Sequence, residues 1–176
     1  MSKNRVIPYQ PIDLAEPADL LGEIRARRGG QLINLDRMLL HSEPVARGWN
    51  HFIGNIRQKL SLDPKLRELG MCGVAILNGA EYEFFHHAPP FLKAGGTQTQ
   101  VDALRRLGQK DFDKDCFSPT ENDALELTLQ MTRQIQVDPA LMARLQKSLG
   151  NTILVELVTV IAAYNMVSRF LIALDV

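Results

Sequence analysis

The sequence predicts an all-α chain, and two observations carry that prediction. Apolar residues recur at helical spacing in one segment after another, and no segment of useful length alternates as a half-buried strand does. Helix start and stop signals separate these segments, with proline in first turns and glycine after last turns. Because 176 residues with 45% hydrophobic content can bury a real core, we expect a single helical domain over 19–176. Residues 1–18, which contain three prolines, are expected to form an extended arm.

Each helix is predicted from its own boundary signals. A polar residue that can cap the first turn, often with proline directly after it, precedes most of the apolar segments. The expected N-caps are Asp19, Asn34, Asp63, Thr97 and Ser118. The expected helices span residues 20–28, 34–41, 43–60, 64–77, 80–94, 98–107, 119–136, 139–149 and 153–174.

Two prolines lie inside the fifth expected helix. Pro89 and Pro90 lack the backbone N–H that would bond the carbonyls of Phe85 and His86, and their rings clash with the preceding turn. We therefore expect this helix to kink or break near Ala88.

The last segment, 153–174, is apolar nearly all round and is about long enough to span a membrane. Glu156, Asn165 and Arg169 lie inside it and argue against a membrane span. We expect instead a helix that is buried centrally or shared with a second subunit.

Charge and cysteine content exclude several classes of protein. The 20 basic and 20 acidic side chains balance, so no net basic field favours a nucleic-acid partner. The first residues lack the apolar stretch of a signal peptide, so we expect a cytoplasmic location. Cys72 and Cys116 form neither a CxxC pair nor a metal cluster, which predicts no disulfide framework. Cys72 lies in an apolar run and is expected to be buried.

Titratable side chains gather on both sides of a break at Asn78-Gly79. Glu68 lies eleven residues before Gly79, and His87 lies eight after it. At about 1.5 Å per residue these are roughly 16 and 12 Å from the turn, so a helical hairpin would bring the two together. Glu83 is four residues before His87 and shares its helix face. Glu81 and His86, in contrast, are expected to face solvent.

The segment GAEYEFFHHAP and the glutamate before it resemble the core of the carboxymuconolactone decarboxylase / alkylhydroperoxidase D-like (AhpD-like) family. The AhpD-like pattern is a glutamate, a Cys-x-x-Cys pair and a histidine four residues after the second cysteine. Here Glu68 and His87 match, whereas Ala80 and Glu83 stand at the two cysteine positions, so the chain resembles a Cys-less branch. WNHFIG (49–54) and YNMVSRFLIAL (164–174) also fit, and the resemblance covers about residues 35–174.

The resemblance implies an AhpD-like helical bundle that assembles as a homo-dimer, trimer or hexamer. It also implies a cofactor-free acid–base enzyme of the decarboxylase type, acting on a small carboxylate or lactone. Glu68 would orient His87. His87 or Glu83 would move a proton to or from a carbon next to a carboxylate or lactone. The expected partners are a small-molecule substrate and further copies of the chain, without nucleic acid or membrane.

The resemblance also suggests residues that line a substrate pocket. An aromatic wall beside His87 would exclude water and perturb the pKa of this histidine. Phe84 stands where the resembled branch usually has tryptophan, and Arg57 or Lys65 is a candidate for holding an anionic substrate. The predicted substrate-binding residues are Trp49, Tyr82, Phe84, Tyr164 and Asn165.

Three alternatives remain at this point. An AhpD-like peroxiredoxin or alkylhydroperoxidase role would need thiols that positions 80 and 83 lack. A non-catalytic oligomer that binds a small molecule would need only the pocket, and Glu83 with His87 would then be an ordinary helical pair. A metal site on that pair would need a third ligand from Glu68, His41 or His51, and we expect none.

Overall fold

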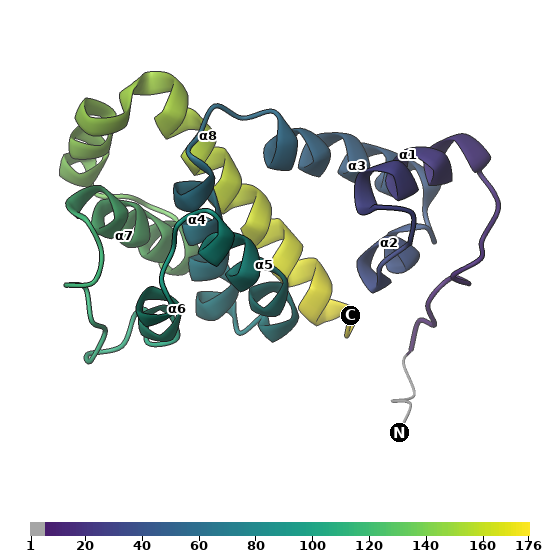
Figure 1. Cartoon of the computed structure of the whole chain (residues 1–176), viewed down its shortest axis with the longest axis horizontal. Coiled ribbons are helices and arrows are strands. Elements are labelled where there is room, and N and C mark those ends of the chain that lie inside the picture. The colour runs from purple at the N-terminus through teal and green to yellow at the C-terminus, as the bar shows by residue number, and fades with distance from the viewer. Residues whose placement is uncertain (1–5) are drawn as a thin grey trace. The chain divides into compact units, whose positions relative to one another are not determined.

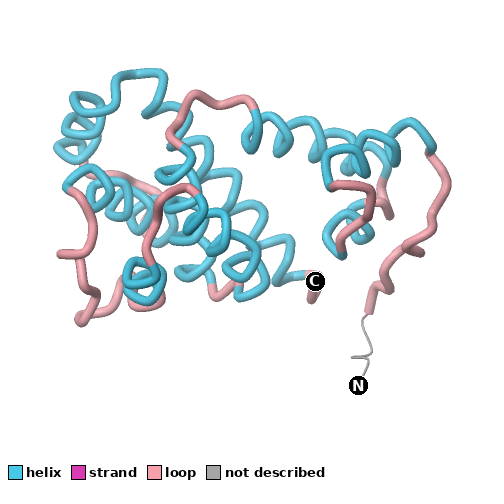
Figure 2. Tube along the Cα trace, in the orientation of Figure 1, coloured by secondary structure: helices cyan, strands magenta, loops and turns pink. Residues whose placement is uncertain are grey.

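The computed structural model describes residues 6–176, and every regular element in that range is a helix (Figure 2). The predicted all-α class is therefore confirmed. The part of the expected arm over 1–5 lies outside the described residues. The helices are α1 (Ala18–Arg28), α2 (Asn34–Leu39), α3 (Glu43–Gln58), α4 (Pro64–Asn78), α5 (Glu81–Lys93), α6 (Gln98–Leu104), α7 (Pro119–Arg133) and α8 (Pro139–Ala173), labelled in Figure 1.

By their internal contacts these helices divide into two compact units. The first comprises Met1–Leu60 with Leu171–Val176, and the second comprises Ser61–Phe170. The predicted limits of a single domain, 19 and 176, stay a prediction.

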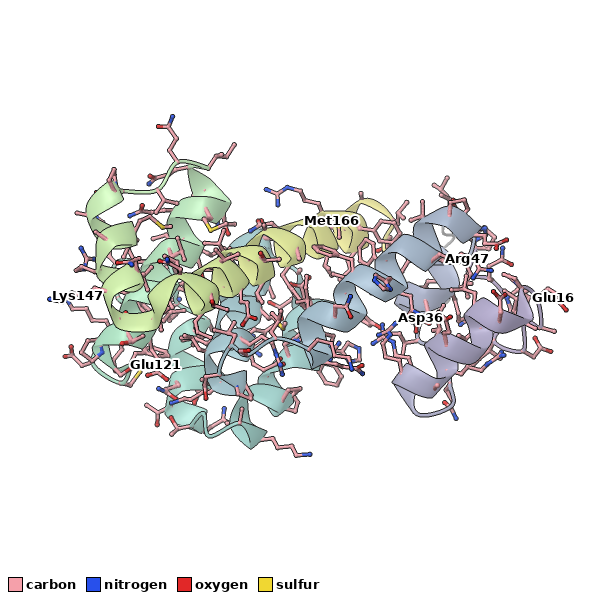
Figure 3. The ribbon with its side chains drawn as sticks, turned by 90° about the horizontal axis from the view of Figure 1, so that it is seen from above. Glu16, Asp36, Arg47, Glu121, Lys147 and Met166 are labelled. Atoms are coloured by element: carbon pink, nitrogen blue, oxygen red, sulfur yellow. The ribbon has the colours of Figure 1, made fainter. Side chains whose placement is uncertain are left out.

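An ion pair joins α1 to α2 in the first unit. Arg28 Nε lies 3.0 Å from Asp36 Oδ2, and the Asp36 side chain, labelled in Figure 3, is only 1% exposed. The same oxygen accepts the backbone N–H of Ile33 at 3.1 Å, so one carboxylate both ties two helices together and satisfies the start of α2. Ile33, not the expected Asn34, is the N-cap of α2.

The first helix also begins earlier than expected. Its N-cap is Pro17, and Asp19 lies inside the first turn without capping it. An acidic side chain there still interacts favourably with the helix dipole. In contrast, the expected caps Asp63, Thr97 and Ser118 each accept a backbone N–H from the first turn of the helix that follows.

α5 runs unbroken through both prolines, so the expected break near Ala88 is wrong, and the other expectation, a kink, stays a prediction. The carbonyls of Phe85 and His86 lose their helical donors, but both residues are exposed, and water can bond those carbonyls instead. The free-energy cost of the hydrogen bonds that the prolines remove is therefore too small to interrupt the helix.

In the second unit α4 packs most extensively on α5 and α7. Gly79 ends α4 with φ of 70°, a left-handed conformation that favours glycine, and α5 starts two residues later. The chain thereby reverses in a tight turn, and α4 and α5 lie side by side as a hairpin (Figure 1).

α8 is two helical segments joined at Gly150, whose φ of 75° and ψ of 168° are not helical. This interruption agrees with the two separate helices that the sequence predicts for this region. By length and composition α8 is the described helix that could cross a membrane, with half of its most apolar stretch buried in the protein. A core helix has the same properties, so this observation is weak evidence for a membrane.

Candidate functional site

The α4–α5 hairpin brings Glu68 and His87 into contact. Glu68 Oε2 and His87 Nδ1 lie 2.7 Å apart, although 19 residues separate them in the chain. Both residues are buried, with 3% and 4% of their surface exposed. The prediction that a hairpin would bring these two residues together is confirmed. Their catalytic roles stay a prediction.

Arg67 contacts the other oxygen of the same carboxylate. Its Nη2 lies 3.2 Å from Glu68 Oε1, so Glu68 is held at both oxygens. An ionised carboxylate only accepts hydrogen bonds, so in that state Nδ1 of His87 is the donor. Nε2 is then the ring nitrogen at which His87 can exchange a proton.

Glu83 lies one turn before His87 on α5 and is buried against α8. Ser168 Oγ donates a hydrogen bond to Glu83 Oε2 at 3.0 Å, and the two residues are 2% and 0% exposed. Glu83 Oε1 is also buried but has no hydrogen-bond partner among residues 6–176. Ser168 therefore holds one carboxyl oxygen, and the hydrogen-bonding capacity of the other is not used by any described residue.

Burial sets the protonation of Glu83. It raises the pKa of this carboxyl from 4.5 to about 8, and the hydrogen bond from Ser168 opposes the rise only in part. Glu83 is thus largely neutral near pH 7 and can act as an acid. A neutral carboxyl beside a histidine that is held by a second carboxylate is an arrangement suited to proton transfer.

Cys72 lies on α4, one turn after Glu68, and its thiol is in the same region. Burial raises the pKa of this thiol far above its ordinary value, and the negative charges of Glu68 and Glu83 raise it further. The thiolate is therefore strongly disfavoured, as expected for a cysteine that packs as a small apolar side chain.

Of the predicted pocket residues, Tyr164 contacts His87, and Phe84 is buried on the same helix as His87. The Tyr164 ring meets the His87 ring edge to face, with centroids 4.9 Å apart. Phe84 is 1% exposed, and the guanidinium of Arg105 lies 4.5 Å from its ring centre. Tyr82 is only half-buried, and its ring lies 4.4 Å from that of His86, which is exposed as expected.

Asn165 makes a different set of contacts. Its Oδ1 accepts from Asn78 Nδ2 at 3.0 Å and from Arg169 Nη1 at 2.8 Å, and its Nδ2 donates to Thr132 Oγ1 at 3.0 Å. The amide thus joins the ends of α4 and α7 to α8. Its substrate-binding role stays a prediction, as does that of Trp49, a buried residue of α3 in the other unit.

The other candidates from the sequence are Glu81, Lys65 and Arg57. Glu81 is exposed and forms an ion pair with Arg105 at 3.6 Å. Lys65 forms an ion pair with Glu121 at 2.7 Å. Glu121 is labelled in Figure 3 at the start of α7. Arg57 belongs to α3. Among residues 6–176 no group of three or more His, Cys, Asp or Glu side chains is arranged to hold a metal ion.

With this geometry in view, comparison with protein families gives one match. The model of the carboxymuconolactone decarboxylase family matches residues 43–130, half of the chain, and that range includes Glu68, Glu83 and His87. The chain belongs to the carboxymuconolactone decarboxylase family. The predicted family is therefore confirmed.

Solved structures show the same fold. An uncharacterized peroxidase-related protein from Silicibacter sp. TM1040 is 15% identical with a TM-score of 0.79, over 99% of this chain and 91% of that one. A cysteine-to-alanine variant of the debrominase Bmp8, in complex with 2,3,4-tribromopyrrole, is 16% identical with a TM-score of 0.77, over 98% and 92%. At these identities the likeness concerns the fold, which is AhpD-like. No curated protein matches the chain.

Sequence reasoning missed two residues of the site, Arg67 and Ser168. Arg67 directly precedes Glu68, so its position next to the predicted Glu68–His87 pair is the sequence signal for this contact. Ser168 lies one turn after Tyr164 in an apolar helix, and a serine at 0% exposure needs a polar partner. That partner, Glu83, is 85 positions away.

Proposed function

We propose that this member of the carboxymuconolactone decarboxylase family is a cofactor-free acid–base enzyme. Its substrate would be a small carboxylate or lactone, and Glu68, Glu83 and His87 would carry the chemistry. The observation that supports this most is the buried contact of Glu68 with His87, 2.7 Å, beside a second buried carboxyl. Two carboxyl groups in such different surroundings can hold different protonation states at one pH.

In this proposal each group has one task. Glu68 holds the imidazole of His87 through Nδ1, and Nε2 accepts or returns a proton at a carbon next to the carboxylate or lactone. Glu83, which is neutral near pH 7, protonates the carbon from which carbon dioxide leaves. The carbon–carbon bond breaks, its electron pair takes the proton of Glu83, and Glu83 regains a proton from water.

Lyase activity is tested with carboxylated lactones and other small carboxylates as substrates, by following carbon dioxide release. We expect turnover that falls at least about 100-fold in His87→Gln and in Glu83→Gln, the size usual for loss of a general acid or base. Glu81→Gln is the matched control, because Glu81 lies on the same helix but is exposed. Turnover that both buried substitutions leave intact would contradict the assignment.

Binding of a carboxylated lactone without turnover would favour the alternative of a non-catalytic binding protein. A peroxidase or debrominase function, suggested by the names of the two similar structures, receives less support. Such thiol chemistry needs a thiolate and a resolving thiol. Ala80 and Glu83 stand at the family's cysteine positions, and burial raises the pKa of the Cys72 thiol.

We also infer self-association and a cytoplasmic location. Support for self-association comes from α8, where Val155, Ala162 and Met166 are exposed on one face at helical spacing. Met166 is labelled in Figure 3 and is 41% exposed, and Val155 is 64% exposed. Sedimentation of the wild type against Val155→Glu tests this, and a monomeric wild type would contradict it.

A further inference from the structure

The Glu83–Ser168 pair has a geometry that assigns the two carboxyl oxygens different roles. Ser168 Oγ lies 3.0 Å from Glu83 Oε2, and both side chains are buried, on α8 and α5. Oε1 of the same carboxyl is buried and has no hydrogen-bond partner among the described residues, 6–176. A polar oxygen that is buried and unsatisfied in a native protein requires an explanation.

The direction of the hydrogen bond between Ser168 and Glu83 follows from counting the buried polar groups that each arrangement leaves unpaired. Two arrangements fit a neutral Glu83: Ser168 donates to Oε2, or a proton on Oε2 is donated to Ser168. In the second arrangement the Ser168 hydroxyl proton has no acceptor, because Glu83 is its one hydrogen-bond partner within 6–176. It also leaves Oε1 unsatisfied. The first arrangement leaves fewer buried polar groups unpaired, so Ser168 is the donor.

The donor at Oε2 then decides where the acidic proton lies. In a protonated carboxyl the carbonyl oxygen is the better acceptor, and the oxygen that accepts from Ser168 is therefore the carbonyl. The hydroxyl oxygen is Oε1. This O–H donor is buried with no acceptor among residues 6–176, so an acceptor atom of a ligand is what would satisfy it.

We propose that Ser168 is a positioning residue that makes Oε2 of Glu83 the carbonyl oxygen and leaves the acidic proton on Oε1, where a bound carboxylate or lactone receives it. The assignment of this proton to substrate rests on the function proposed above. After the transfer Ser168 still donates to Oε2, so the same hydrogen bond stabilises the carboxylate that remains.

Other groups near Glu83 act on the same proton. From α4 come Glu68 and Cys72, whose thiol is sensitive to the charge of both carboxyl groups. His87 follows on α5 itself, and its ring meets Tyr164 of α8. Because burial disfavours the thiolate of Cys72, Glu83 and the Glu68–His87 pair are the groups that can exchange protons here.

The test is an infrared titration of the intact protein, which needs neither substrate nor turnover. A neutral carboxyl has a carbonyl stretch, and Glu83→Gln identifies the Glu83 band by removing it. In the wild type we expect that band to persist at neutral pH and to disappear with a midpoint near pH 8. Ser168→Ala should move the band to higher frequency, because the carbonyl loses its donor, and should make Glu83 an about tenfold weaker acid.

Thr128→Val is the matched control. Thr128 is also 0% exposed, and its hydroxyl donates to the backbone carbonyl of Ala124 at 2.7 Å, so the variant loses a buried hydroxyl of purely structural function. It should leave frequency and midpoint unchanged. A lower midpoint in Ser168→Ala would show that Ser168 accepts from Glu83 and would overturn the proposal, as would an unchanged band.

The infrared result separates this inference from the proposed function. One outcome is that the band and midpoint shift as expected while no carboxylate or lactone is turned over. In that case Ser168 still keeps the acidic proton of Glu83 on Oε1, and the proposed reaction fails. If turnover depends on Glu83 but Ser168→Ala leaves the pH profile of activity unchanged, the reaction stands and the role of Ser168 is overturned.

Discussion

Glu68 Oε2 lies 2.7 Å from His87 Nδ1, and Arg67 holds the second oxygen of the same carboxylate. The glutamate is therefore fixed from both sides, by its own neighbour in α4 and by the facing helix α5. A histidine held through Nδ1 keeps one orientation.

The first prediction concerns the stability that this contact provides. Glu68→Ala leaves Nδ1 of His87 buried without its acceptor, and we expect the free energy of unfolding to fall by about 3 kcal/mol. Glu81→Ala is the control, because its pairing with Arg105 is exposed and should be worth less than about 1 kcal/mol. Urea unfolding followed by circular dichroism measures both, and equal losses would contradict a special role for the pair.

The second prediction is a pH dependence of stability due to Glu83. Burial raises the pKa of Glu83 to about 8 in the folded protein, against 4.5 without burial. Between these values the folded state binds more protons than the unfolded state, so this group makes stability fall as pH rises. Its full stabilising contribution is present below about pH 4.5 and is lost as pH rises through about 8.

Glu83→Gln removes this dependence, because an amide does not ionise. Relative to the wild type, the variant should gain stability between about pH 5 and about pH 9. The gain should reach a few kcal/mol, since a tenfold change in proton affinity is worth about 1.4 kcal/mol. Melting temperatures across this range give the measurement. A constant difference between the two proteins would mean that Glu83 has the same pKa in the folded and unfolded states.

The third prediction compares two glycines of α4. A Cβ at Gly73 would lie 3.1 Å from Thr128 Cγ2 and 3.3 Å from Leu107 Cδ2, so these buried side chains would have to shift by a few tenths of an ångström. Gly73→Ala should therefore cost about 1–2 kcal/mol of stability. A Cβ at Gly70 would make an ordinary contact, 3.6 Å from Ile161 Cγ1, so Gly70→Ala should be neutral or stabilising by up to about 1 kcal/mol. Thermal unfolding of both variants gives the comparison, which fails if Gly70→Ala is the worse.

The fourth prediction distinguishes acid–base from thiol chemistry. In the native protein Cys116 is partly accessible, and burial followed by the charge of Asp113 raises the pKa of its thiol. We expect one slowly reacting thiol near pH 7 in titration with a disulfide reagent, and a second, Cys72, only after unfolding. A fast native reaction that Cys72→Ala abolishes would instead revive the redox function.

The centre of the site could be predicted from sequence because it depends on local rules. The break at Gly79 and the residue counts on either side of it place Glu68 and His87 at similar depths in a hairpin. The N-caps Asp63 and Thr97 could also be predicted from the sequence, because their side chains bond backbone N–H groups within one turn.

Contacts that come from far along the chain could not be predicted in this way. The amide of Asn165 bonds Asn78, 87 positions away, and the sequence shows no trace of that pairing. The expectation of a break at Ala88 also relied on local rules alone. Local propensity counts the lost hydrogen bonds of the prolines, whereas packing of Phe91, which is fully buried, keeps the helix in place.

The turn at Gly79 has a consequence for how this family can change. The backbone N–H of Ala80 bonds the carbonyl of Ala75 across the turn, so main-chain atoms determine how the two helices are aligned. We therefore expect substitutions at Ala80 and Glu83 to leave Glu68 and His87 in their places. Substituting positions 80 and 83 would place different reactive side chains on the same helical hairpin. Inserting one residue after Gly79 would instead turn α5 by about 100° and separate Glu68 from His87.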